Sequence, residues 1–159
     1  MEAADARGEA ARLIASQRWL ALGTVDRNGL PSVTYAPFAV AGGAFVVVVS
    51  ALAVHAANLA ANPAASIMLV GDDGADAYSR TRLTVAVSVG ENAAGSPAAD
   101  AIWSALETRQ GETVQVLRTL PDFRPLSLTP LRGRLVLGFA SAHQLGGPAL
   151  AELLRGLSG

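Results

Sequence analysis

The chain has 159 residues and a formal net charge of −1, and its hydrophobic fraction of 51% includes few aromatic residues. This length and composition predict one domain with an aliphatic core, and the balanced charge argues against nucleic acid as a partner. The absence of cysteine and of lysine excludes disulfides, thiolate catalysis, iron–sulfur clusters and lysine Schiff bases, and two histidines are too few for a multi-histidine metal site.

The N-terminal segment predicts a helix at residues 6–16, because Ala10, Leu13 and Ile14 recur at helical spacing. Residues 1–17 are charged and rich in alanine, and they lack the basic region and apolar core of a signal peptide. No apolar run in the chain has the length that crosses a membrane. We therefore expect a cytoplasmic protein that makes no membrane contact.

Apolar and β-branched runs separated by tight turns predict an antiparallel meander. Asn28-Gly29 and Gly42-Gly43 are the turn signals, since glycine readily adopts the positive φ that such turns need. Pro37 lies within the second run and indicates an edge strand or a bulge there. The predicted strands are residues 19–25, 32–40, 45–50, 66–70, 82–89, 126–128 and 134–139. Six or seven strands in so apolar a chain favour a small barrel over a sheet with open edges.

Three more helices are predicted between and after the strands. The first begins near Leu52 and stops at Asn62-Pro63. The second opens at Ser96-Pro97, with the serine as N-cap and the proline in the first position, and runs to about Thr108. The last covers residues 149–157. Helices therefore lie at both ends of the chain and between strands.

The junction between the strand at residues 45–50 and the following helix is a candidate anion site. The first N–H groups of a helix have no partner within it, and they favour a phosphate. Ser50 ends the strand, and His55 is a titratable donor in the first helical turn. Each residue also has a purely structural interpretation, with Ser50 as a helix cap and His55 as an exposed side chain, and both interpretations stay open.

Four stretches carry a resemblance to a known family: residues 20–31, 50–63, 82–85 and 134–139. Their order is similar to that of the FMN-binding split β-barrel superfamily of pyridoxamine 5′-phosphate oxidase-like proteins. Within it the chain most resembles the HugZ-like haem-utilisation branch, which has a similar histidine and Asn-Leu pair where His55 and Asn58-Leu59 stand. The resemblance covers about residues 13–145. It implies a mainly β (α+β) fold, a six- to seven-stranded antiparallel split β-barrel with peripheral helices, as a single domain over residues 1–159.

The resemblance also implies an FMN site between the two subunits of a homodimer. The cofactor-binding residues that it implies are Thr34, Tyr35, Ala36, Pro37, Ser50, His55 and Arg82. The family's oxidases usually have a lysine where His55 stands and another cation before it, where this chain has Val54. An FMN phosphate would therefore lose one full charge here, and the imidazole would be only partly protonated near neutral pH.

We therefore expect an FMN-binding flavoprotein, an oxidoreductase acting on an unknown small substrate, with no catalytic side chain identified. A haem-binding or haem-degrading protein of the same fold is the first alternative, with His143 as the axial ligand and His55 in reserve. A degenerate barrel without a cofactor is the second. Arg124, Arg132 and Arg134 are candidate cations for a substrate phosphate, but the C-terminal half shows no likeness to the substrate-binding end of pyridoxamine phosphate oxidases.

Overall fold

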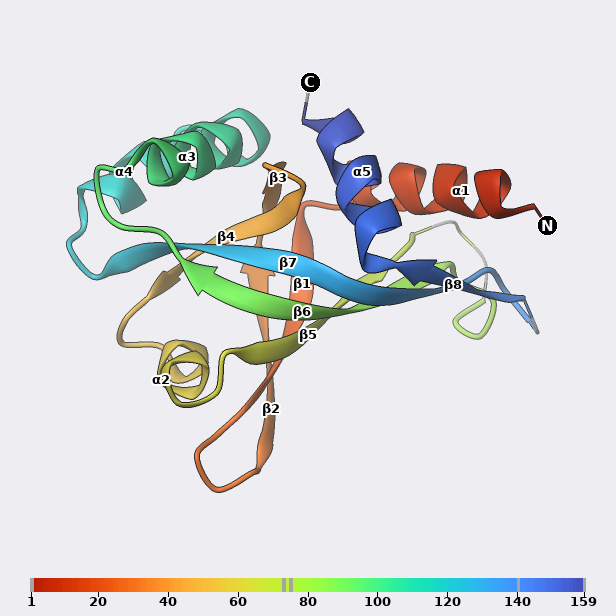
Figure 1. Cartoon of the computed structure of the whole chain (residues 1–159), viewed down its shortest axis with the longest axis horizontal. Coiled ribbons are helices and arrows are strands. Elements are labelled where there is room, and N and C mark those ends of the chain that lie inside the picture. The colour runs from red at the N-terminus through yellow and green to blue at the C-terminus, as the bar shows by residue number, and fades with distance from the viewer. Residues whose placement is uncertain (1, 73, 75, 140, 159) are drawn as a thin grey trace.

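The computed structural model describes residues 2–72, 74, 76–139 and 141–158 (Figure 1). One antiparallel sheet and the helices around it make up this part of the chain. The helices are α1 (Ala3–Ser16), α2 (Val54–Ala61), α3 (Pro97–Gln110), α4 (Thr113–Thr119) and α5 (Gly147–Leu157). The strands are β1 (Trp19–Val25), β2 (Pro31–Pro37), β3 (Ala39–Ala41), β4 (Ala44–Ser50), β5 (Ala64–Val70), β6 (Arg82–Glu91), β7 (Phe123–Val136) and β8 (Ala142–Gly146).

The strand order in the sheet is β2-β1-β5-β6-β7-β4-β3, and β8 pairs with the last part of β7. The sheet curls into a half-barrel, so that β2 also contacts β4 without pairing with it. In Figure 1 the β1–β2 hairpin projects away from the body of the sheet, and α2 lies beside it. The predicted mainly β, antiparallel split barrel with peripheral helices is confirmed.

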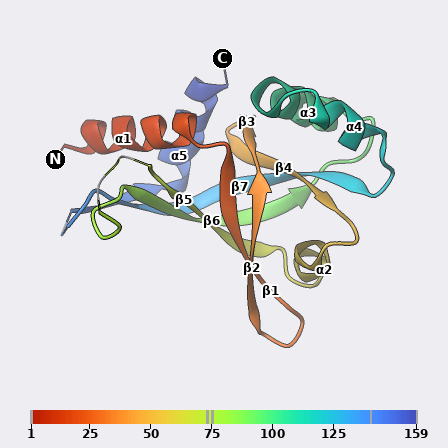
Figure 2. The same ribbon diagram turned by 180° about the vertical axis from the view of Figure 1, so that it is seen from behind.

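Two apolar clusters lie on the two faces of β4. The larger one fills the inside of the half-barrel, where strand residues such as Phe45 and Val47 meet α1, α2 and α5. The smaller one joins Val46 and its neighbours on the other face to Trp103 of α3. Figure 2 shows α3 and α4 together at one end, with α1 and α5 at the other. Because β4 is covered on both faces, it reads as a continuous apolar run in the sequence.

The elements differ from the prediction in three places. The predicted strand at 32–40 is two strands, because Pro37 ends the edge strand β2 and the next N–H, that of Phe38, bonds to Arg18 O at 3.2 Å. The strand predicted at 126–128 and the first half of the one predicted at 134–139 belong to the single strand β7, which ends at Val136, so residues 137–139 are not in a strand. Strand β8 and helix α4 were not predicted. In the part of the chain that the structure describes, eight strands therefore form the sheet, where six or seven were expected.

A β-bulge divides β7 into two halves, with mainly even-numbered side chains buried before it and the odd-numbered ones buried after it. Ala86 pairs with Arg132 and Val87 pairs with Pro130, so Leu131 is an extra residue without a partner on β6. The bulge restarts the alternation of side chains, and Arg132 and Arg134 consequently point away from the core. Pro130 at the bulge has no N–H to donate, which suits a position where the ladder is interrupted.

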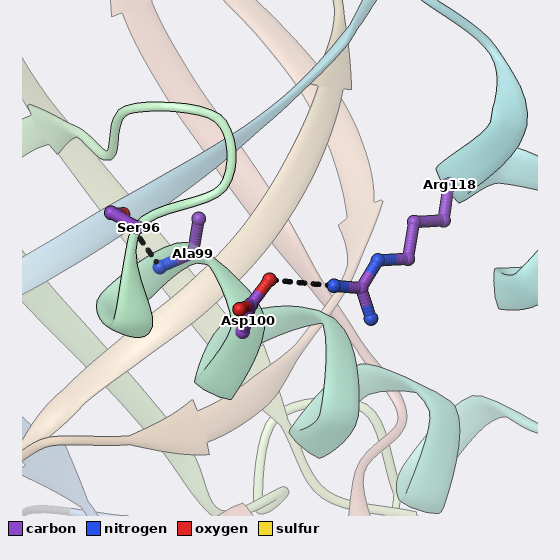
Figure 3. A network of polar contacts seen from close by, with 4 residues as sticks. All are labelled: Ser96, Ala99, Asp100 and Arg118. Carbon is purple, nitrogen blue, oxygen red and sulfur yellow. Dashed lines mark hydrogen bonds and ion pairs between the residues drawn. The ribbon is translucent and has the colours of Figure 1, made fainter.

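Figure 3 shows the N-terminal cap of α3 and an ion pair that joins α3 to α4 on the surface. Ser96 caps α3 as predicted, and its Oγ accepts a hydrogen bond from Ala99 N at 3.1 Å. Arg118 of α4 reaches back to Asp100 in the first turn of α3, with 2.6 Å between Nη2 and Oδ1. Both side chains of this ion pair are half exposed, so it holds the two helices together only weakly.

Helix α5 depends on a glycine where it begins. A Cβ added at Gly147 would lie 2.7 Å from Pro130 O and 2.8 Å from Leu131 O, which are backbone atoms of the bulge. We expect Gly147→Ala to lower the free energy of unfolding by about 1–3 kcal/mol, because α5 must move off β7. Gly156→Ala in the same helix is the matched control, since nothing lies within 4 Å of the added Cβ. It should be neutral or stabilising in urea unfolding, and equal losses in the two variants would contradict this account.

No helix among the described residues is both long enough and apolar enough to cross a membrane.

Candidate functional site

The predicted cofactor residues lie on two faces of the sheet. Along β2 the side chains alternate, so Thr34 and Ala36 point into the half-barrel, while Tyr35 and Pro37 point outward. Arg82 opens β6 on the outer face, opposite Val70 and Val136. Ser50 and His55 lie at the junction of β4 and α2. Within one chain, Arg82 and His55 therefore lie on opposite faces of the sheet.

Thr34 and His55 are brought together on the inner side. Thr34 Oγ1 and His55 Nδ1 are 2.8 Å apart, which ties the first turn of α2 to β2. A second contact acts in parallel, in which buried Asn58 of α2 donates to buried Thr24 of β1 at 3.0 Å. Two polar contacts thus hold α2 against the β1–β2 hairpin. Partial burial of the His55 ring lowers its pKa, so the ring is mostly neutral at neutral pH.

Ser50 has a partner that a phosphate would have to displace. Its Oγ donates to Asp122 Oδ2 at 2.8 Å and accepts from Leu52 N at 3.2 Å. Ser50 is not the N-cap of α2, because the helix begins at Val54 with Ala53 before it. The interpretation of Ser50 as a helix cap is therefore wrong, and the start of the helix near Leu52 is corrected by two residues.

The surroundings of this corner are poor in free positive charge. A cleft of about 370 Å³ runs beside α2, with Leu59 and Leu126 among its walls. Its lining contains one arginine, Arg124, whose Nη1 lies 3.5 Å from the carboxylate of Glu91. The mostly neutral ring of His55 adds little positive charge, and the Asp122 carboxylate beside Ser50 adds a negative one. The corner between β4 and α2 thus offers a phosphate hydrogen-bond donors but little net charge.

The positive charge gathers instead on the outer face of β6 and β7. Three clefts of about 540, 370 and 490 Å³ adjoin there, and we call them together the outer trough. The first two share Thr84 and Arg134, and the last two share Ser66, Ala86 and Arg132. One end of the trough is lined by Tyr78, Arg82, Val136, Gly138, Phe139, Ser141 and Ala142. The lining of the other end includes Pro31, Ser32, Val33 and Leu131.

Three arginines line this trough without a carboxylate beside them. Arg82, Arg132 and Arg134 all face it, and the described residues that line it include no aspartate or glutamate. Arg82 Nη1 donates to Arg80 O at 3.3 Å, whereas the salt bridges found among the described residues involve other arginines. The apolar side chains of Val33, Leu131 and Phe139 lie at the ends. Such a surface suits a flat, largely apolar molecule that carries carboxylates or another anionic group.

Large apolar side chains also lie on the outer face next to the trough. Trp19, Val33, Tyr35 and Met68 are 54%, 76%, 66% and 40% exposed. The Trp19 and Tyr35 rings meet edge to face, with 5.7 Å between their centroids. Exposed apolar groups in one connected area are typical of an interaction surface.

His143, the residue expected to bind haem iron, is not among the described residues that line the outer trough. It pairs with the core residue Leu135, so its side chain is on the other face of the β7–β8 hairpin from that of Ala142, which lines the trough. Its Nε2 lies 3.3 Å from Ser141 Oγ. The described residues contain no cluster of three or more histidine, cysteine, aspartate or glutamate side chains able to hold a metal ion.

The combination of Arg132 and Arg134 with Arg82 was not predicted from the sequence. Arg132 and Arg134 were candidates for a substrate phosphate, and neither Tyr78 nor Phe139 was a candidate site residue. The available signal was Pro130 inside a β-branched and leucine-rich run, which is typical of a bulge. A bulge there would have turned both arginines outward, to the face that Arg82 also occupies.

The burial of His55 predicts how stability changes with pH. Its folded-state pKa is below the ordinary value of 6.5, so the unfolded chain binds more protons between the two values. The free energy of unfolding should therefore fall as the pH drops through 6.5, and the loss should level off below the folded-state pKa. Urea unfolding of the wild type and of His55→Asn, compared between about pH 5 and pH 8, measures this difference. A difference that does not change with pH would contradict the burial of the ring.

The chain is similar to several known proteins. The sequence profile described as pyridoxamine 5′-phosphate oxidase matches residues 6–137. Heme oxygenase HutZ of Vibrio cholerae is 34% identical over 140 residues, which cover 87% of this chain and 80% of that protein. The crystal structure of the V. cholerae heme storage protein HutZ superposes with a TM-score of 0.74 at 32% identity, over 82% of this chain and 92% of that one.

Two further solved structures are longer than this chain. A heme-binding protein from Mycobacterium smegmatis has a TM-score of 0.84 at 28% identity, over 92% of this chain. Campylobacter jejuni ChuZ has a TM-score of 0.85 at 25% identity, over 94% of this chain. The chain spans 60% and 62% of the lengths of these two proteins.

Proposed function

The chain belongs to the pyridoxamine 5′-phosphate oxidase family, and we propose that within this family it is a haem-binding protein whose outer trough holds the tetrapyrrole. The observation that carries this proposal is the set of three arginines in a trough with no acidic side chain among its described lining residues. The names of HutZ and of the mycobacterial structure, which are described as haem proteins, support the same ligand.

The residues of the trough fit the chemical groups of haem. Haem is a flat apolar ring with two propionate groups on one edge. Arg132 and Arg134 are outward residues two positions apart on one strand, a spacing of about 7 Å, which suits two neighbouring carboxylates. Val136 and Phe139 offer apolar surface to the ring. The bound haem would supply redox chemistry at iron, and these residues would orient it and shield it from water.

A flavin fits the same structure less well. The site expected for its phosphate has the Asp122 carboxylate on Ser50 and a neutral ring at His55. The contact between Thr34 and His55 supports a structural role for both residues, in holding α2. FMN-dependent oxidoreductase activity, our expectation from the sequence, is therefore the second candidate, supported by the family match.

We also propose that the protein forms a homodimer through the outer face of the sheet. Trp19, Val33, Tyr35 and Met68 would leave water on dimer formation, and a second copy would cover the open side of the trough. Light scattering of the purified protein tests this. A monomer at all concentrations, with and without haem, would contradict the dimer.

Titration with ferric haem and, in parallel, with FMN tests the proposed function. We expect a saturable Soret band with haem at a defined stoichiometry and no stable complex with FMN. A yellow protein that retains FMN through gel filtration would favour the flavoprotein. Binding of neither ligand would favour a barrel that has lost its cofactor. Loss of haem absorption on addition of a reductant in air would extend the proposal to haem degradation, the activity in the name of the V. cholerae relative.

A further inference from the structure

The outer trough contains one side chain suited to bind ferric iron. Among the lining residues that the structure describes there is no histidine, cysteine or methionine, and Tyr78 is the one phenol. A tyrosine oxygen is an established type of axial ligand to haem iron. The two histidines of the chain lie elsewhere, with His55 against Thr34 and His143 on the other face of its hairpin.

The backbone at Tyr78 is fixed while its ring is free. Tyr78 N donates to Asp76 Oδ1 at 2.9 Å, and Ser79 Oγ donates to Asp76 Oδ2 at the same distance. The Ser79 hydroxyl lowers the pKa of Asp76, so this carboxylate remains an acceptor down to acid pH. The side chain of Tyr78 is nonetheless 79% exposed and contributes to no buried cluster. Because the turn already fixes the backbone, only the side chain of Tyr78 has to be ordered when it binds a ligand.

The neighbours of Tyr78 are those that a haem ligand needs. Arg82 lines the same cleft as Tyr78, so its positive charge lies near an oxygen ligand of ferric iron at this end of the trough. The turn at Gly138 lies against the Tyr78 loop, since a Cβ added at Gly138 would be 3.6 Å from Ser79 O. Phe139, next in the chain, is 73% exposed at the same end of the trough. The phenol, a cation and an apolar ring therefore lie together.

We propose that Tyr78 is the axial ligand of the ferric iron, an inference that rests on the proposed haem-binding function. On binding, a bond forms between Tyr78 Oη and Fe(III), the phenol proton passes to water, and the iron remains ferric. Arg132 and Arg134 hold the propionates further along the trough.

The test compares ferric-haem complexes of four proteins: the wild type, Tyr78→Phe, His143→Ala and Tyr35→Phe. Tyr35→Phe is the matched control, because Tyr35 is the chain's other tyrosine and is not among the described residues that line the trough, and phenylalanine keeps the ring that packs on Trp19 at the proposed dimer interface. Resonance Raman spectra report iron–phenolate vibrations, and electron paramagnetic resonance reports the spin state. Neither readout depends on turnover.

We expect phenolate vibrations and a high-spin ferric signal in the wild type, in Tyr35→Phe and in His143→Ala. Tyr78→Phe should lose the vibrations and bind haem roughly tenfold more weakly or worse, while the arginines still give a Soret band. Phenolate vibrations that persist in Tyr78→Phe, or an imidazole signature that disappears in His143→Ala, would overturn the assignment but leave haem binding intact. Absence of a Soret band in all four proteins would overturn the proposed function, and the ligand assignment with it.

Discussion

Replacing Arg132 and Arg134 together by glutamate is expected to weaken haem binding by at least about 100-fold. Each arginine would otherwise donate charged hydrogen bonds to a propionate, worth about 1.5–3 kcal/mol each, and about 1.4 kcal/mol is a factor of ten in affinity. Glutamates would add repulsion between like charges. Both side chains are exposed on the outer face, so the midpoint of urea unfolding should hardly change. Haem titration followed at the Soret band measures the effect.

Arg7→Glu with Arg27→Glu is the control for this pair. Both residues are exposed, neither lines the outer trough, and the double change lowers the net charge by the same amount. The control should bind haem as the wild type does. If both double variants weaken binding equally, the effect comes from net charge and not from the trough. If neither does, the arginines of β7 do not hold the ligand.

Most strands of the barrel could be predicted from local sequence, but the continuity of β7 through its bulge could not. Two short strands were expected at residues 126–128 and 134–139, because Thr129, Pro130 and Gly133 interrupt the apolar pattern. In the structure, those residues form the bulge and its surroundings within one strand. Pro130 marks an interruption, but whether the strand continues beyond it depends on pairing with β6 and on the close approach of Gly147 of α5 to Pro130 O and Leu131 O. Both are tertiary contacts that a single run of sequence does not encode.

Of the contacts in the candidate site, one could be predicted from the sequence and one could not. The proximity of Thr34 and His55 could be anticipated, because the resemblance assigned both residues to one ligand. The contact between Ser50 and Asp122 could not, since it joins residues 72 positions apart through a part of the chain left unassigned. That carboxylate changes the electrostatics of the corner expected to bind a phosphate. The ligand preference therefore depends on long-range contacts that neither motif order nor local spacing specifies.

The contact between Arg109 of α3 and the link between α1 and β1 is also a long-range contact that local sequence does not specify. Arg109 Nη2 donates to the carbonyl oxygens of Ile14 and Gln17, and its guanidinium lies 4.6 Å from the centroid of the Phe38 ring. Carbonyls at the C-terminal end of a helix have no partner within it, and the last turn of α1 has no basic residue of its own. Burial lowers the pKa of Arg109, and the charge of Arg18 adds to this, yet a guanidinium remains protonated at neutral pH.

Arg109→Ala is expected to lower the free energy of unfolding by about 2–4 kcal/mol, because two carbonyls lose a charged donor and Phe38 loses the cation over its ring. In this variant Gln110 would still connect α3 to the starts of β1 and β3, since its Nε2 donates to Arg18 O at 2.6 Å and to Phe38 O at 2.9 Å. Arg118→Ala, which removes only the exposed ion pair with Asp100, should cost less than about 1 kcal/mol. Urea unfolding curves with equal slopes would make the two losses comparable. Equal losses in these two variants would mean that α1 is held by its apolar face alone and that Arg109 is an ordinary surface charge.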